Sequence, residues 1–465
     1  MSWFSFFRTD RYPYIAMTSK VITGPGRPLM GSAALNRLKL NAEIPAFCFD
    51  GKECDGVIQA RVSVRPESHR INDLPFLPIR VKGQGGRQVK SFRVSCYTCL
   101  RLRRKDLCPH DLEERSFRGV FTMSELAYAV ARLGYVLMEV ESALVYPGLE
   151  FVFKEFMQLF ASRKICCEGL PAGWEPEAYC QGINDAMGFT GKDRVTPDKL
   201  AENGYEKSAM KAVLNFSIGK LSQRPSHPVT EFVRNQSRLA EIFADPSLEV
   251  SHAFLIDPEV LQVKYEKKQS FLPASRKTQS VINAIITGKA RAYLDSQLRL
   301  LIEDGHVPLY SDTDSVVIKS PKNSSDPLLK HPAIFGQWKS EVAEDGYILR
   351  FMALSAKNYA YEVADARTGE VVARVTKIRG LTLKGAVAEA MSPELLLHFV
   401  RELAAGRTVR KYVPQFTLKI DGVEKTIEAV EIQKMYSNVC NEKRFFRPDV
   451  DDTKLWAYGV TQWRR

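Results

Sequence analysis

The alternation of apolar and polar residues predicts several β-strands in this chain. The segment Gly56–Val64, GVIQARVSV, alternates as a strand with one buried face does, and Tyr135–Tyr146 follows the same rule. Shorter strand patterns cover Val250–Leu255 and Val260–Tyr265, and two further strands flank the polar segment Asp365–Gly369. Strands are therefore expected along most of the chain.

Apolar residues at helical spacing predict helices between and after these strands. One helix follows an N-cap at Thr122 or Ser124 and ends before Gly134, and another has Pro197 in its first turn and runs to Pro225. Together, the helices and strands predict a mixed α/β (α+β) fold. The remaining predicted helices are Leu149–Ser162, Gln279–Glu303 and Pro393–Gly406.

The segment Val307–Lys319, VPLYSDTDSVVIK, has two apolar runs around a polar centre, which predicts a β-hairpin that bends at Ser311–Ser315. The centre contains Asp312 and Asp314. Residues two apart on a strand point to the same face, so both carboxylates are expected to converge on one hard cation. Mg²⁺ is commonly bound by one or two carboxylates together with a substrate phosphate. The hairpin is therefore a candidate metal site for phosphoryl transfer.

Four residues of the helix that precedes Pro225 recur at four-residue steps: Lys207, Lys211, Asn215 and Gly219. This spacing places them on one stripe of a helix face. The lysines suit triphosphate oxygens, the amide suits a hydrogen bond, and the glycine permits close approach of a ligand. Alternatively, the stripe is the solvated side of an amphipathic helix. Only the presence of the aspartate hairpin in the same chain favours a nucleotide site.

A second candidate metal site lies in residues 91–115, SFRVSCYTCLRLRRKDLCPHDLEER. Cys96, Cys99, Cys108 and His110 have a C-x2-C and C-x-H spacing that suits a tetrahedral Zn²⁺ ion. Two interpretations stay open: a zinc knuckle, or reduced cysteines that pack a small loop. The basic residues between the ligands are either a solvated charge run or phosphate contacts. These residues are Arg101, Arg103, Arg104 and Lys105.

Length and composition narrow the function classes. A chain of 465 residues exceeds one hydrophobic core and predicts about three domains. Its formal charge of +12 favours a polyanionic partner. The sequence has no apolar run of about 18 residues and no signal-peptide pattern, so we expect no membrane span. Nine cysteines in this length favour an intracellular, reducing compartment, such as a nucleus, cytoplasm or virion, over a disulfide framework.

These motifs, in this order, resemble family B DNA polymerases of the protein-primed branch, which is found in viruses, linear plasmids and large DNA transposons. Tyr310–Ser315, YSDTDS, is similar to motif C of that family, and Lys211–Arg224, KAVLNFSIGKLSQR, is similar to motif B. Lys357–Tyr359, followed by Lys377–Gly380, resembles the Lys-x-Tyr motif that contacts the primer–template duplex. The cysteine cluster and the E-E-R after it also resemble a segment of the transposon and virus group. The resemblance covers residues 10–385.

The resemblance implies a right-hand polymerase architecture with an antiparallel palm sheet, helical fingers and a mixed thumb, without the exonuclease domain. The implied regions are 1–147, the N-terminal part of the palm with a Cys/His insertion at 85–118; 148–225, the fingers; 226–277, an insertion at the place where relatives encircle the template; 278–385, the catalytic core of the palm; and 386–465, the thumb.

The resemblance also implies the roles of individual residues. Asp312 and Asp314 would bind two Mg²⁺ ions, and the stripe of Lys207, Lys211, Asn215 and Gly219 would bind the incoming nucleotide. Lys357, Tyr359 and Lys377 would contact the duplex through its backbone. The implied partners are primer–template DNA, deoxynucleoside triphosphates and a terminal protein primer, and the chain is expected to be a monomer.

The sequence departs from the family pattern at two places. Motif B has Phe216 and Ile218 where the family has a serine and an aromatic residue. Motif A normally supplies a further aspartate, and RYPYIAMTSKVITG, which starts at Arg11, is similar to the sequence after motif A. We therefore expect that aspartate to lie before Met1, because the context of the nearby Asp10 does not match.

Two functions from different classes follow from this reasoning. The first is DNA-directed DNA synthesis by a two-metal mechanism. The second is an inactive polymerase relic that still binds primer–template DNA. A reverse transcriptase is a weaker third interpretation, because its metal-binding turn usually has adjacent aspartates.

Overall fold

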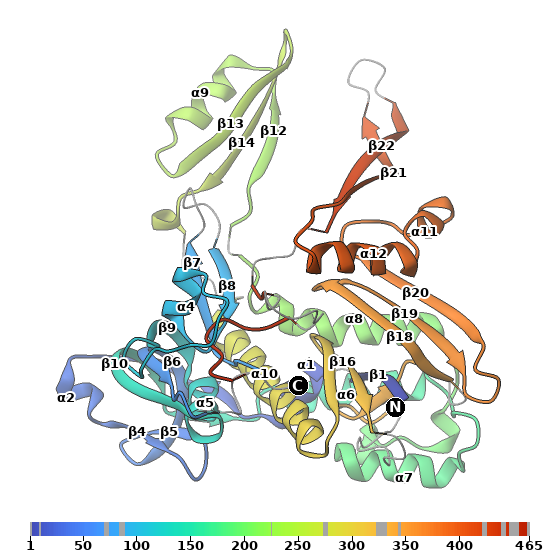
Figure 1. The fold of residues 1–465 in the computed structure, drawn as a ribbon. Coiled ribbons are helices and arrows are strands. Elements are labelled where there is room, and N and C mark those ends of the chain that lie inside the picture. The colour runs from blue at the N-terminus through green and yellow to red at the C-terminus, as the bar shows by residue number, and fades with distance from the viewer. Residues whose placement is uncertain are drawn as a thin grey trace. The chain divides into compact units, whose positions relative to one another are not determined.

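The computed structural model combines α-helices with antiparallel β-sheets (Figure 1). The mixed α/β class predicted from the sequence is confirmed. The chain divides into two compact units, the larger of Met1–Leu214, Ala284–Gln415 and Gln433–Arg465 and the smaller of Asn215–Asn283 and Phe416–Ile432. The division into palm, fingers, insertion and thumb stays a prediction. The structure describes residues 2–8, 11–68, 74–82, 89–224, 226–272, 278–321, 333–342, 346–420, 426–438, 443–445 and 455–462.

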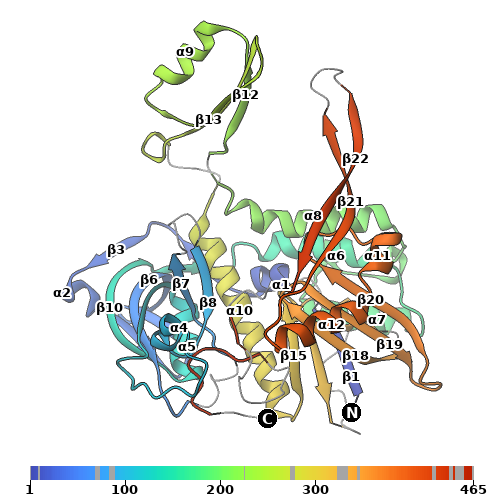
Figure 2. The same cartoon turned by 45° about the horizontal axis from the view of Figure 1, so that its top comes forward.

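The larger unit contains a seven-stranded sheet in the order β15–β16–β1–β18–β19–β20, with β17 paired to β1. Val316 and Ile318 of β16 pack with Trp338, whereas Val317 packs with Ile348. Because successive side chains on a strand point to opposite faces, the sheet is covered on both sides. Helix α12 lies along β18–β20 (Figure 2). The bounds are β1 (Ser2–Arg8), β15 (Val307–Asp312), β16 (Ser315–Ser320), β17 (Trp338–Ser340), β18 (Gly346–Ser355), β19 (Asn358–Asp365), β20 (Val371–Ile378) and α12 (Pro393–Ala404).

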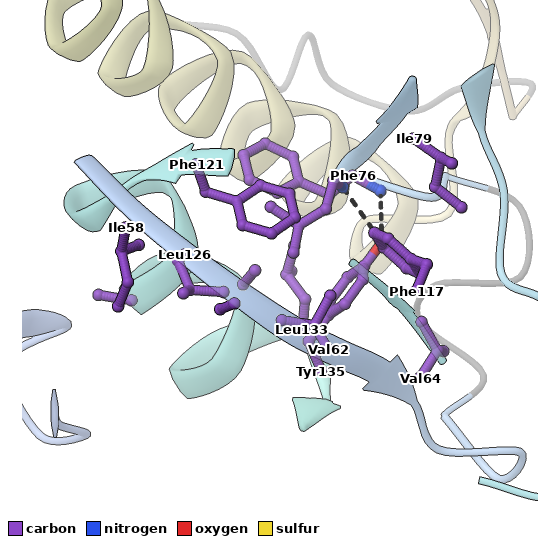
Figure 3. Close-up of a cluster of buried hydrophobic side chains, with 14 of the residues drawn as sticks. Ile58, Val62, Val64, Phe76, Ile79, Phe117, Phe121, Leu126, Leu133 and Tyr135 are labelled. Carbon is purple, nitrogen blue, oxygen red and sulfur yellow. Dashed lines mark hydrogen bonds between the residues drawn. The ribbon is translucent and has the colours of Figure 1, made fainter. Parts of the chain in front are cut away.

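A second sheet of the larger unit has the order β3–β10–β6–β5–β4, and β9 pairs with β6. Ile58, Val62 and Val64 of β6 are fully buried and belong to the apolar cluster that also contains α5 residues (Figure 3). The Tyr135 hydroxyl accepts a hydrogen bond from the backbone N–H of Phe76, at 3.0 Å. The bounds are β3 (Arg27–Met30), β4 (Leu38–Asn41), β5 (Ala46–Phe49), β6 (Lys52–Val64), β9 (Phe117–Thr122), β10 (Tyr135–Tyr146) and α5 (Met123–Leu133).

Helix α10 (Ser280–Glu303) contacts the first sheet and helix α5. Its Leu298 side chain enters the apolar cluster of β16. On another face of the helix, Arg291 donates two hydrogen bonds to the Glu125 carboxylate of α5, at 2.7 and 2.9 Å. At Gly288, an added Cβ would lie 2.7 Å from the Thr122 hydroxyl oxygen, so a larger residue would separate α10 from α5. The predicted helix is confirmed, and its contacts connect the first sheet with α5, which packs on the second sheet.

Local sequence signals predicted several other elements correctly. The strands expected at Gly56–Val64 and Tyr135–Tyr146 lie in β6 and β10. Of the two candidate N-caps, Thr122 caps α5, because its hydroxyl accepts the Glu125 N–H at 3.3 Å. Gly134 ends α5 with a φ of 78°, a left-handed conformation that glycine adopts without steric cost.

Two predicted helix starts are wrong. The helix expected to begin near Pro197 begins at Gly204, as α8 (Gly204–Lys220), because the backbone N–H of Ala201 bonds to the Cys166 carbonyl at the end of α6 and holds that stretch extended. The helix expected from Leu149 begins at Lys154, as α6 (Lys154–Cys166), because β11 (Gly148–Glu150) pairs with β2 (Val21–Thr23). Tertiary hydrogen bonds outside the helices decided both starts.

The smaller unit contains the three-stranded sheet β12–β14–β13 and helix α9. The strands predicted at Val250–Leu255 and Val260–Tyr265 lie in β13 and β14.

No helix in the described part of the chain is long and apolar enough to span a membrane. The remaining α-helices and strands of the described residues are α1 (Arg11–Thr18), α2 (Ser32–Leu35), β7 (Pro78–Lys82), β8 (Val89–Arg93), α4 (Tyr97–Leu102), α7 (Pro176–Met187), β12 (Val229–Val233), α9 (Gln236–Ala244), β13 (Leu248–Asp257), β14 (Val260–Lys267), α11 (Ala386–Ala390), β21 (Arg410–Ile420) and β22 (Ile427–Ser437), and short 3-10 helices cover Gly191–Asp193, Pro197–Lys199 and Gln269–Phe271.

Candidate functional site

The aspartate hairpin has the predicted strand–turn–strand form. Asp312 is the last residue of β15 and pairs with Ser315, the first residue of β16. Asp314 lies in the turn between them, so its expected position on a strand face is wrong. Its backbone N–H donates to the Asp312 carbonyl at 2.7 Å. Thr313 has a left-handed φ of 59°, a conformation that is costly for a β-branched residue and recurs at functional sites.

The Lys-x-Tyr motif lies against this hairpin. Lys357 occupies the turn between β18 and β19, and its ammonium group is 2.9 Å from the Asp312 carboxylate, although the residues are 45 positions apart. The Lys357 backbone N–H donates to the Tyr310 hydroxyl at 2.8 Å. The hydrogen bond to Asp312 raises the pKa of Lys357, so the lysine stays charged. The turn therefore already stabilises a cation at the Asp312 carboxylate.

Aromatic rings pack against one another beside the two turns. The Tyr310 ring lies 4.9 Å from the Tyr359 ring and 5.8 Å from the Phe351 ring, measured between centroids. Burial raises the pKa of Tyr359 to about 12, so its phenol stays neutral. Tyr359 also pairs across the sheet with Lys377 on β20, which is exposed. The packing fixes the relative position of motifs that are distant in sequence.

Strand β1 lies on the other edge of the hairpin. Phe7 of β1 pairs with Ser315, so β16 has β15 on one edge and β1 on the other. The residues of β1 that pair beside β16, Ser2–Arg8, include no Asp or Glu, and the expectation that a further aspartate lies before Met1 stays a prediction. Asp10 lies outside the described residues. The described part of β1 therefore offers no third carboxylate beside Asp312 and Asp314, and the binding of Mg²⁺ by these two residues stays a prediction.

Helix α8 contains the predicted nucleotide stripe. Lys211, Asn215 and Gly219 are exposed on this helix. The motif B departures face differently: Phe216 is 73% exposed, whereas Ile218 is buried. The aromatic position of the family pattern therefore contributes an apolar core residue in this chain. The nucleotide-binding role of the stripe stays a prediction.

Lys207, the first residue of the stripe, is already paired within the protein. Its ammonium group lies 3.3 Å from the Glu168 carboxylate, which also accepts a 2.8 Å hydrogen bond from the buried Lys164. Burial alone would raise the pKa of Glu168, but the two lysines outweigh burial and hold the pKa below its ordinary value. Sequence reasoning missed Glu168, because no motif links it to α8.

The four Cys/His residues come together in one cluster beside α4. The His110 Nδ1 atom lies 3.4, 3.3 and 3.5 Å from the sulfur atoms of Cys96, Cys99 and Cys108. Hydrogen bonds from the other two thiols, and then the charge of Arg115, lower the pKa of Cys108, which favours the thiolate form that binds metals. Such a group can bind zinc. Arg115 is the last residue of the E-E-R motif. That motif is the sequence feature that could have indicated its contact with the cluster.

Comparison with known proteins supports the fold. No protein-family model and no curated protein matches the chain. Among solved structures, the chain is similar to phi29 DNA polymerase complexed with primer–template DNA and incoming nucleotide substrates, with a TM-score of 0.54 and 12% identity. The match covers 93% of this chain and 58% of the polymerase chain. Phi29 DNA polymerase is a protein-primed family B enzyme, so the resemblance predicted from the motifs is confirmed as a likeness of fold.

Proposed function

We propose that this chain transfers nucleotides from deoxynucleoside triphosphates to a primer 3′-hydroxyl under the direction of a template strand. The observation that supports this most is the contact between Lys357 and Asp312, which joins the two turns of motif C and Lys-x-Tyr in one sheet. The similarity of the fold to that of a DNA polymerase also supports nucleotide transfer. The net charge of +12 suits a nucleic-acid partner.

In this mechanism the chain's own residues bind and orient the reactants. Asp312 and Asp314 would hold Mg²⁺ against the triphosphate, and that ion would stabilise the charge that develops on the transferred phosphoryl group. Lys211 would bind the triphosphate of the incoming nucleotide, and Asn215 would help to position it. When DNA binds, the Lys357 ammonium group would leave the Asp312 carboxylate and pair with a backbone phosphate. Lys377 would add a second phosphate contact.

The second candidate function is a polymerase relic that binds primer–template DNA without extending it. The observation in its favour is strand β1, whose residues Ser2–Arg8 bring no carboxylate to the hairpin. A two-metal site needs oxygen ligands around both ions. On this proposal Lys357 and Lys377 keep their DNA contacts while the metal site stays incomplete.

Primer extension with Mg²⁺ and four deoxynucleoside triphosphates separates the two functions. We expect Asp314→Asn to lower the extension rate roughly 10³-fold, as expected when a group that stabilises developing charge is lost. Asp304→Asn, at an exposed position after α10, is the matched control and should leave the rate unchanged. Equal extension by Asp314→Asn and the unmodified chain would overturn the assigned site.

DNA-binding measurements complete this test. Both candidate functions predict binding of primer–template DNA that weakens with salt, and Lys377→Ala should reduce the slope of log affinity against log salt by about 0.9. Binding without any extension by the unmodified chain would favour the relic. Extension by the unmodified chain would exclude it.

A further inference from the structure

We propose that Cys96, Cys99, Cys108 and His110 hold a structural Zn²⁺ ion, and that this zinc centre fastens the C-terminal segment 455–462 to the N-terminal sheet. The proposal concerns stability and tail docking, so it goes beyond the proposed polymerase function and does not rest on it. Both parts belong to the larger unit of the chain.

The distances from His110 Nδ1 to the three sulfur atoms match a tetrahedral zinc site, and all four ligand atoms lie within 4.8 Å of one another. With Zn–S of about 2.3 Å and Zn–N of about 2.0 Å, a tetrahedron has S···N edges of about 3.5 Å. The observed separations between the sulfur atoms and His110 Nδ1 are 3.3 to 3.5 Å. Four protein ligands leave no open coordination position, which is typical of a structural site and not of a catalytic one.

The C-terminal segment is hydrogen-bonded to one ligand residue and to the neighbour of another. The Cys108 backbone N–H donates to the Val460 carbonyl at 2.8 Å, and the N–H of Ser95, next to Cys96, donates to the Tyr458 carbonyl at 2.9 Å. Gly459 lies between these two contacts with a φ of 91°, and an added Cβ would lie 2.3 Å from the Cys96 backbone nitrogen. Only glycine fits this approach, so the segment and the cluster are closely matched.

Side chains of the segment bury apolar area against the same region. Trp456, Tyr458 and Val460 are buried within the apolar cluster that contains Cys96 and Cys99. Arg103 places its guanidinium 5.8 Å from the Tyr458 ring centroid. This basic residue of the cysteine loop therefore contacts the C-terminal segment through a cation–π interaction.

Arg115 links the cluster, the sheet and the segment. It is fully buried, and its guanidinium donates to the Val64 carbonyl of β6 at 2.9 Å, to the Cys108 sulfur at 3.0 Å and to the Gly459 carbonyl at 3.1 Å. Zn²⁺ with three thiolates and a neutral imidazole carries one net negative charge, which this buried cation compensates. The charge balance therefore favours the metal-loaded cluster.

Two measurements on the full chain test the metal and the docking. Elemental analysis of purified protein should find zinc equimolar with the chain, and Cys99→Ser should lose it, while Cys166→Ser, at a cysteine on α6 outside the cluster, should retain it. Removal of zinc with a chelator should then accelerate hydrogen exchange of the amides in segment 455–462. Zinc far below equimolar, or a tail whose exchange ignores the chelator, would overturn the proposal.

A reciprocal variant keeps the test decisive if Cys99→Ser fails to fold. Gly459→Ala should displace the segment while all four ligand residues stay in place. By thermodynamic linkage, the variant should weaken zinc affinity by the same factor by which zinc slows opening of the segment, roughly 10- to 100-fold. Gly182→Ala is the control, because an added Cβ there meets nothing within 4 Å. A displaced tail with unchanged zinc affinity would contradict the coupling.

Discussion

The Cys/His cluster and the aspartate turn are polar sites of the same unit with opposite construction. The cluster draws its ligands from within 15 residues of the chain: Cys96 and Cys99 are buried, Cys108 and His110 are half-buried, and a buried arginine donates to Cys108. The aspartate turn joins residues 45 positions apart, and its Lys357–Asp312 pair is 60% and 25% exposed. A closed ligand set suits a permanent metal, whereas an accessible ion pair on tight turns can be exchanged for a substrate.

Left-handed backbone occurs at both sites, and in the cysteine loop it is at Arg103, which ends α4 with a φ of 54°. Thr313 and Lys357, at the two turns of the open site, both have left-handed φ values although neither is glycine. Such residues cost of order 1–3 kcal/mol each and are kept where position matters more than stability. We therefore expect mutations at the cluster to change stability and mutations at the turn to change activity.

The largest test of this comparison is Arg115→Met. Loss of the guanidinium leaves the Val64 and Gly459 carbonyls without this donor and removes the charge beside Cys108, so we expect a loss of about 4 kcal/mol in the free energy of unfolding. Chemical denaturation measures this loss, and primer extension per folded molecule should not change. Arg118→Met, at a side chain 68% exposed, should change stability by less than about 0.5 kcal/mol. Lost activity with intact stability would break the comparison.

The Lys164–Glu168–Lys207 triad sharpens the comparison, because it is partly buried but includes a predicted nucleotide-binding lysine. Glu168→Gln should lower stability at neutral pH by about 2 kcal/mol, since Lys164 loses its carboxylate partner. The pKa of Glu168 is lowered from 4.5, so its stabilising effect is present above that pH and is lost as the pH falls through the lower native value.

Denaturation at a series of pH values checks this sign. The stability difference between Glu168→Gln and the unmodified chain should shrink below about pH 4.5, the ordinary pKa of the carboxyl group. Glu202→Gln, at an exposed glutamate, is the control. A difference that stays constant into acid would show that charge pairing is not the cause.

The smallest expected effect is at Thr313. Replacement by glycine removes the steric cost of the left-handed turn but adds unfolded-state entropy, for a net gain of about 0.5 kcal/mol. The looser turn should extend primers more slowly, although the fold is slightly more stable. Thr368→Gly, at a turn residue whose own φ is not positive, should instead destabilise the chain. Denaturation midpoints of the two variants distinguish the signs.

Local patterns predicted the elements whose signals are complete within one segment. Thr122 and Gly134 mark the ends of α5, and the polar centre of the β15–β16 hairpin marks its turn. Helix α7 was missed, although Pro176 at its start and Gly188 at its end are ordinary boundary signals, because the segment has turn-rich flanks. The start of α8 failed for another reason, since the hydrogen bond from Ala201 to α6 is invisible in sequence.

The sequence by itself determined the residue types of both sites and the likeness to protein-primed polymerases, because spacing within a turn, a helix face or a short loop is a local property. Tertiary structure decided which of these groups meet. It paired Lys357 with Asp312 and Lys207 with Glu168, and it brought the C-terminal segment into hydrogen bonds beside the Cys/His cluster. It also put β1, which has no carboxylate, beside the hairpin. These pairings depend on sheet order and core packing among distant segments, which no local pattern encodes.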